Sequence, residues 1–202
     1  MGTVERALSM ACAMTWSFVS FPGVTLHTNP GSFIQEAEAV LETEDRERSG
    51  QQDFDFFIGR WKIQNRRLRE RLKGSNEWDE FEGTSVARPL WGGRANIDEY
   101  EGDGPAGPIY GLTLRLYDPK TKQWSLHWSN SANGTLDKAM IGRFENGRGE
   151  FYNEDTFEGR SIFVRFIWSV LTPISCRWEQ AFSADGGKTW ETNWIMDFTR
   201  VP

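Results

Sequence analysis

The cysteine and histidine side chains that could act as nucleophiles or metal ligands are few and lie far apart in this sequence. The two cysteines and two histidines lack the paired spacing of a structural zinc site, and two cysteines exclude a framework of several disulfides. Cys176 has no histidine at the spacing of a known catalytic pattern, and the chain contains neither a G-x-S-x-G elbow nor a glycine-rich phosphate loop. The sequence therefore identifies no catalytic residue and predicts no cofactor.

One acidic cluster comprises Glu150, Glu154, Asp155 and Glu158, which invites a metal-binding interpretation. Its spacing lacks the D-x-D-x-D-G arrangement of a calcium loop, and it straddles the turn of an expected hairpin. A solvated turn accounts for these residues better, so we predict no metal site.

A basic stripe lies between residues 60 and 71, and three acidic residues follow between 79 and 82. If the two segments are neighbouring antiparallel strands, the opposite charges face each other across the ladder. We therefore expect cross-strand ion pairs and not a basic binding surface. The residues concerned are Arg60, Arg66, Arg67, Arg69 and Arg71 on one side and Asp79, Glu80 and Glu82 on the other.

The segment from Ser183 to Trp190 resembles the Asp-box of sialidases and related propellers, S-x-D-x-G-x-T-W. The motif occurs once, whereas a propeller needs one copy in each blade and several hundred residues. In a structural interpretation, Asp185 accepts turn amides, the adjacent glycines supply positive φ, and Trp190 folds over the hairpin. We predict a braced hairpin and not a sugar-cleaving site.

Composition limits the classes of protein to which the chain can belong. Its 202 residues include 23 basic and 29 acidic side chains, a net charge of −6 that provides no basic footprint for nucleic acid. Hydrophobic residues make up 38% of the chain, which is enough for a core. Aromatic residues make up 14%, and 20 glycines are interspersed among them. This balance favours short strands and tight turns, so we expect a globular all-β protein without an integral membrane segment.

The first fifty residues differ from the rest and are expected to form an N-terminal extension. Residues 7 to 35 carry no charged side chain, and their apolar part has the length of the hydrophobic region of a secretory signal. Against a signal, Glu5 accompanies the single basic residue before this stretch, no clean cleavage site follows, and Pro22 interrupts a spanning helix. We predict a cytoplasmic protein in which residues 1–50 are an extension, with export by a signal peptide as the alternative.

From Phe54 onward, segments of alternating apolar and polar residues are separated by turn residues, which is typical of successive antiparallel strands. Closing such a sheet removes its exposed edges, so residues 51–202 are predicted to form one antiparallel barrel of about ten strands. The clearest strands cover 111–117 and 123–129, which form a hairpin, and then 161–170, 175–183 and 189–201. The last of these places Trp190, Thr192, Trp194, Met196 and Phe198 on one face.

Gly59 and Trp61 open the first long strand, directly after residues 53–58, which we expect to form a short helical plug across one barrel end. In lipocalins and their calycin relatives a G-x-W motif occupies this position, and a basic residue near the end of the last strand packs over its tryptophan. Arg200 is similar to that basic residue. The resemblance implies that Gly59, Trp61 and Arg200 close the barrel, with a cation–π contact between the two side chains.

Three longer stretches resemble a bacterial domain family of unknown function that is grouped with lipocalin-like and nitrobindin-like barrels. They read DFDFFIGRWKIQNRRL, WEQAFSADGGKTWETNW and MDFTRV, and the resemblance covers nearly all of residues 53–201. It implies a fold but no activity. Nitrobindin-like barrels bind haem through a histidine near the chain end, whereas His127 lies opposite the aromatic face and His27 lies in the extension. Haem is therefore not expected.

The inward face of the barrel defines the candidate ligand site. If Trp61 and Arg200 point inward, the alternation of side chains along the last strand also directs Trp194 inward. Asn65 and Arg67 are polar residues on the inward face of the first strand, and such buried polar groups need hydrogen-bond partners. We predict that a small hydrophobic, apolar or aromatic molecule binds in the lumen without catalysis. The predicted ligand-binding residues are Trp128, Trp168, Trp178, Gln180, Trp194 and Tyr110.

Two other classes of function stay open at this point. Related lipocalin-like barrels include cyclases and decarboxylases, so an enzyme of the cyclase, isomerase or decarboxylase type could position its substrate with Tyr110, Arg67 and Gln180. A lumen filled by side chains would instead indicate a partner-binding module. The sequence does not indicate an oligomeric state, and the presence of a cavity is the observation that separates these alternatives.

Overall fold

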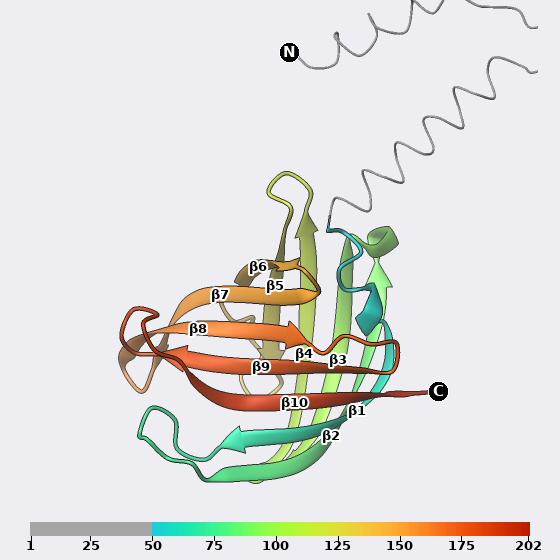
Figure 1. The fold of residues 1–202 in the computed structure, drawn as a ribbon. Helices are drawn as coiled ribbons and strands as arrows, with labels where there is room; N and C mark the ends of the chain where they lie inside the picture. The colour runs from blue at the N-terminus through green and yellow to red at the C-terminus, as the bar shows by residue number, and fades with distance from the viewer. Residues whose placement is uncertain (1–49) are drawn as a thin grey trace, which may run out of the picture. The chain divides into compact units, whose positions relative to one another are not determined.

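The computed structural model describes residues 50–202, which form a closed barrel of ten antiparallel strands (Figure 1). The predicted all-β class is therefore confirmed. The predictions for residues 1–49, including the signal-peptide alternative, lie outside the described residues. Among these described residues, no helix has the length and hydrophobicity needed to cross a bilayer. The strands are β1 (Gly59–Leu68), β2 (Trp78–Leu90), β3 (Ala95–Gly104), β4 (Gly107–Asp118), β5 (Gln123–Asn130), β6 (Met140–Glu145), β7 (Arg148–Phe157), β8 (Arg160–Ser169), β9 (Ser175–Ser183) and β10 (Glu191–Val201).

β1 closes the barrel because it pairs with both β2 and the last strand, β10. All other pairs join strands that follow each other in sequence, in an up-and-down arrangement. Trp61, Ile63 and Asn65 are buried, while the residues between them are exposed, as expected for a strand with one face in a core. Closure leaves neither β1 nor β10 with an unpaired edge.

A single turn of 3-10 helix, η1 (Asp55–Phe57), plugs one end of the barrel, where the aromatic segment before Gly59 predicted it. Phe54 and Phe57 are each only 1% exposed. Their ring centroids lie 5.9 and 4.8 Å from that of Trp168, in edge-to-face contacts typical of aromatic cores. The plug therefore forms the floor of the lumen.

Arg200 joins the last strand to the first strand and to the plug. Its guanidinium carbon lies 4.2 Å from the ring centroid of Trp61, so the cation–π contact implied by the lipocalin resemblance is present. The guanidinium also donates hydrogen bonds to the carbonyl oxygens of Ile58, at 2.7 Å, and Phe56. Gly59 makes room for it, because a Cβ there would lie 2.5 Å from Nη1 of Arg200, at a φ of +128°.

The hairpin between β9 and β10 has the predicted brace. The Asp185 carboxylate accepts hydrogen bonds from the amides of Lys188 and Thr189, at 3.0 and 2.9 Å. Gly186 and Gly187 have positive φ values of 74° and 86°. The single Asp-box-like segment thus stabilises a turn.

The predicted register at the start of the last strand is wrong. Sequence alternation placed Trp190 and Thr192 on the face of Trp194, but the pairing of β10 with β9 shifts between Thr192 and Trp194. The bulge leaves Asn193 fully buried, and Trp190 packs against the exposed Tyr152. A β-bulge adds one residue to the strand, so the residues before it point to the opposite face from the one that simple alternation predicts. No residue type in this segment indicates the bulge.

One part of the barrel wall contains no strand. β5 and β6 pair over only three residue pairs, and residues 131–139 follow β5 without regular strand pairing. The Asp137 amide donates to the Trp128 carbonyl at 2.8 Å, and Nδ2 of Asn153 donates to the Lys138 carbonyl at 3.0 Å. These bonds hold Asp137 and Lys138 at the edge of the lumen.

Candidate functional site in the barrel lumen

The lumen contains a cavity of about 280 Å³. An apolar cavity of about 150 Å³ accommodates benzene, so this volume suits a molecule of about two rings. A cavity of this size does not fit the partner-binding alternative, which requires a filled lumen. Its aromatic lining consists of Phe57, Tyr100, Trp128, Phe166, Trp168, Trp178, Phe182, Trp194 and Phe198.

Five of the six predicted ligand-binding residues line this cavity. The rings of Trp178 and Trp194 meet edge to face, with centroids 5.7 Å apart and planes at 83°. Such contacts help to hold each indole in one orientation, and both indoles line the cavity. The five residues are Trp128, Trp168, Trp178, Gln180 and Trp194.

Tyr110 does not line the cavity, contrary to the prediction. Its side chain is 52% exposed on β4, and the next residue, Gly111, takes the inward position. A Cβ on Gly111 would lie 2.0 Å from the Trp128 ring, so the indole occupies the space that a side chain would need. The sequence pattern misled because a glycine carries no apolar side chain to mark the inward face.

Tyr100, on β3, is the tyrosine of the cavity, and sequence reasoning missed it. Its hydroxyl donates to Oδ1 of the buried Asn65 at 3.0 Å, and Nε1 of Trp194 donates to the same oxygen at 3.1 Å. Burial raises the pKa of Tyr100 far above its ordinary value, so the phenol stays a hydrogen-bond donor. Asn65, which was predicted to face inward, therefore orients two aromatic walls.

Asp98 and Arg115 form a buried ion pair toward the plugged end, with Nη1 2.5 Å from Oδ1. The same Nη1 donates to Asn96 at 3.1 Å, and Ser85 donates its hydroxyl to the other Asp98 oxygen at 3.1 Å. The pair is neutral as a unit and has its own partners. Sequence reasoning missed it because the two residues belong to different strands and look like ordinary outward charges.

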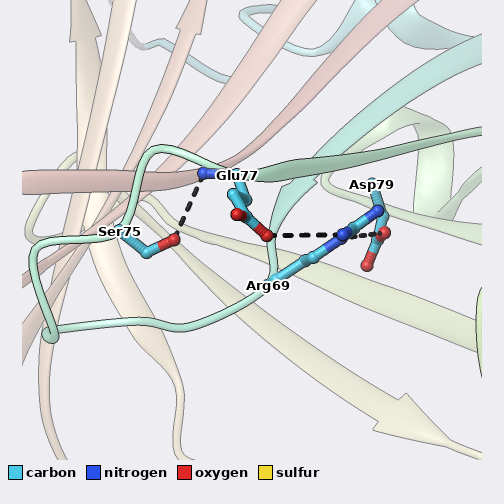
Figure 2. Close-up of polar contacts among 4 residues, drawn as sticks. All are labelled: Arg69, Ser75, Glu77 and Asp79. Atoms are coloured by element: carbon cyan, nitrogen blue, oxygen red, sulfur yellow. Dashed lines mark hydrogen bonds and ion pairs between the residues drawn. The ribbon is translucent and has the colours of Figure 1, made fainter.

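Of the ion pairs expected across β1 and β2, the one between Arg69 and Asp79 forms, on the exposed side of the hairpin. Arg69 lies 2.7 Å from Asp79 and 3.4 Å from Glu77, and the Glu77 amide is held by the Ser75 hydroxyl (Figure 2). Arg67 does not take part in this network. It lines the cavity instead, as Arg71 does. Among residues 50–202, Arg60 and Arg66 also form no ion pair with the predicted acids, so the predicted pairing is wrong for these four arginines.

Arg67 and Arg71 reach the cavity near the end opposite η1. The Arg67 guanidinium carbon lies 4.6 Å from the Trp194 ring centroid, and that of Arg71 lies 5.5 Å from Phe157. Burial lowers the pKa of Arg67. It also lowers the pKa of Arg71 to about 10, and the neighbouring charge of Arg67 adds to this effect.

The acidic cluster separates in space. The exposed Asp155 lies at the edge of the cavity, while the Glu150 carboxylate accepts a hydrogen bond from the Tyr152 hydroxyl at 2.6 Å. Burial, followed by the charge of Asp155, raises the pKa of the other cavity-edge carboxyl, Asp137. Within residues 50–202, no group of three or more histidine, cysteine or acidic side chains is placed to hold a metal ion.

Neither Cys176 nor His127 is placed for nucleophilic catalysis. Burial raises the pKa of the Cys176 thiol to about 12, so the thiolate is scarcely populated at neutral pH. His127 lies between two cavity-facing residues of β5, so it points to the outer face, as predicted, and its ring contacts the Ser125 hydroxyl at 3.3 Å.

Comparisons with known proteins support the fold. No family model and no curated protein sequence matches the chain. Among solved structures, the chain is similar to the S-type phycobiliprotein lyase CPES from Guillardia theta, at 12% identity and a TM-score of 0.51, over 77% of this chain and 97% of that one. It also aligns with two barrels produced by design. The redesigned barrel mFAP0 bound to DFHBI gives 12% identity, a TM-score of 0.41 and coverage of 72% and 99%. A fluorescence-activating barrel designed de novo gives 15% identity, a TM-score of 0.40 and coverage of 73% and 95%. At 12% identity, the likeness to the lyase is one of fold alone.

Proposed function

We propose that this protein binds a small, largely aromatic molecule in the barrel lumen and does not transform it. The observation that carries the proposal is the cavity of about 280 Å³ whose walls include four tryptophans. Aromatic walls with a few polar groups are typical of small-molecule sites. Burial of a flat ligand among indoles gains both apolar contact and ring stacking.

The enzyme hypothesis receives less support from the same site. Tyr110, one of the three residues expected to position a substrate, is exposed on the outer surface. Gln180 donates its amide to Asn193 at 2.7 Å, which engages it within the barrel wall. Gln180 and the Asp98–Arg115 pair are thus engaged by other groups of the barrel.

A cavity-filling substitution tests the proposal. Prodan, a neutral two-ring dye, should brighten with a blue-shifted emission when it enters the unmodified protein, and it should raise the melting temperature. Thr113→Phe places a ring in the cavity and should abolish both effects. Thr84→Phe makes the same change at an exposed position of β2 and serves as the matched control.

Circular dichroism must first show that both variants are folded, so that a loss of dye binding can be assigned to the filled cavity. Dye binding that survives Thr113→Phe would place the dye outside the lumen. A wider panel of neutral aromatic molecules that leaves tryptophan emission unchanged would contradict ligand binding itself.

A further inference from the structure

Two cationic side chains enter the cavity without a counter-ion. Within the described part of the chain, neither Arg67 nor Arg71 forms an ion pair or a side-chain hydrogen bond, although both line the cavity. Nε of Arg67 is buried and has no partner there. Arg69, between them in sequence, has two acidic partners on the exposed side (Figure 2). Arg69 is thus neutralised by carboxylates of the protein, whereas Arg67 and Arg71 face the lumen without such partners.

The nearest carboxylates are engaged elsewhere. Glu191, whose charge acts on Arg71, accepts a hydrogen bond from the Leu72 amide at 2.7 Å. Glu158, which also acts on Arg71, lies 3.9 Å from Lys73. Both carboxylates therefore have other partners close to them, and neither satisfies the guanidinium groups in the lumen.

The other charged residues of the cavity have partners of their own or lie at its edge, so they do not neutralise Arg67 and Arg71. Asp98 and Arg115 neutralise each other at the plugged end. Lys138 donates to the Glu154 carbonyl at 2.9 Å, on the side of the cavity edge where Asp137 and Asp155 lie. On the β1 side, the charge of Asp79 acts on Arg67, but that carboxylate is bound to Arg69. Two like charges in a partly desolvated site favour an added anion.

We propose that Arg67 and Arg71 form a carboxylate-binding subsite, so that the ligand is a small aromatic carboxylic acid. This inference rests on the proposed function, since it assigns the polar end of the same ligand. A guanidinium presents a planar fork that matches the two oxygens of a carboxylate. Trp194 lies under the Arg67 guanidinium, so the aromatic ring of a ligand whose carboxylate binds Arg67 can pack against the aromatic wall of the cavity.

An isosteric pair of probes tests the subsite, because 2-naphthoate and 2-naphthamide share size and shape and differ in charge. Tryptophan quenching and calorimetry with the unmodified protein should show at least about tenfold tighter binding of naphthoate. Arg67→Gln and Arg71→Gln should each bring this ratio toward one, because they weaken naphthoate binding more than naphthamide binding. Arg66→Gln, the same change on the exposed face of β1, should preserve the ratio.

The outcomes separate the two proposals. Equal binding of the two probes to the unmodified protein overturns the carboxylate subsite and leaves the proposed function standing. Absence of binding by both probes, together with absence of prodan binding, overturns the proposed function as well. Arg67→Lys keeps the charge without the fork and should give an intermediate ratio, which tests the geometry if Arg67→Gln does not fold. Tighter binding of 2-naphthalenesulfonate than of naphthoate would reject the carboxylate assignment in favour of a tetrahedral anion.

Discussion

Separating Arg200 from Trp61 should weaken the junction of the first and last strands. The cation–π contact at 4.2 Å contributes about 0.5 to 2 kcal/mol. Arg200→Ala also removes hydrogen bonds from a charged donor to the carbonyls of Phe56, Ile58 and Pro173. The bond to Pro173 is exposed, so water replaces its donor, and the two part-buried bonds contribute about 1 kcal/mol each. Together with the cation–π contact, we expect a total loss of about 2.5 to 4 kcal/mol.

Trp61→Leu is the second arm of a double-mutant cycle. Trp61 is 1% exposed, and its Nε1 donates to the Phe57 carbonyl at 2.7 Å, so the substitution opens a cavity beside the plug. We expect the free energy of unfolding to fall by about 2 to 4 kcal/mol, which is less than replacement by alanine would cost. Leucine is chosen because folded proteins are typically stable by only about 5 to 15 kcal/mol, and the double mutant must still fold.

Urea denaturation followed by circular dichroism measures all four proteins of the cycle. The double mutant should be less destabilised than the sum of the single losses by about 0.5 to 2 kcal/mol, because the contact can be lost only once. Arg88→Ala combined with Trp61→Leu is the control, since Arg88 pairs with the exposed Glu99, and it should be additive. Additivity between Trp61 and Arg200 would refute the idea that their contact joins the two strands.

Three further predictions concern the core. Burial raises the pKa of Asp53 to about 6, so the folded state binds this proton more tightly than the unfolded chain does, and the ionised form costs stability above pH 6. Asp53→Asn should raise the free energy of unfolding at pH 7.5 by about 1 kcal/mol, a figure reduced for partial exposure, and the gain should vanish by about pH 4 in urea titrations; an equal gain at both pH values would contradict this. Asp98→Asn should cost about 3 to 5 kcal/mol by leaving Arg115 unpaired, and Arg115→Met in the same chain should restore most of the loss; failure of that restoration in thermal melts would show that the pair itself is needed. Gly111→Ala should displace the Trp128 ring and shift tryptophan emission, since the new Cβ would lie 2.0 Å from it; an unchanged spectrum would mean that the β4 backbone moves instead.

The fold class and part of the site could be predicted from the sequence because their signals are local. Side chains alternate with period two along each strand, so indoles such as Trp178 and Trp194 could be assigned to the inward face. Likewise, the braced turn at Asp185 depends on residues within a few positions of one another. The G-x-W segment and Arg200 are far apart in the chain, and here the resemblance to lipocalins, not periodicity, supplied the link.

The polar features of the cavity were decided by tertiary structure. Tyr110 was misplaced because its neighbour Gly111 takes the inward position without an apolar side chain to show it. The pair of Asp98 and Arg115 and the unpaired Arg67 look alike in sequence, as charged residues on strands. Whether a charge lies in water, in an ion pair or over an aromatic ring depends on which strands meet across the lumen, and only barrel closure determines that.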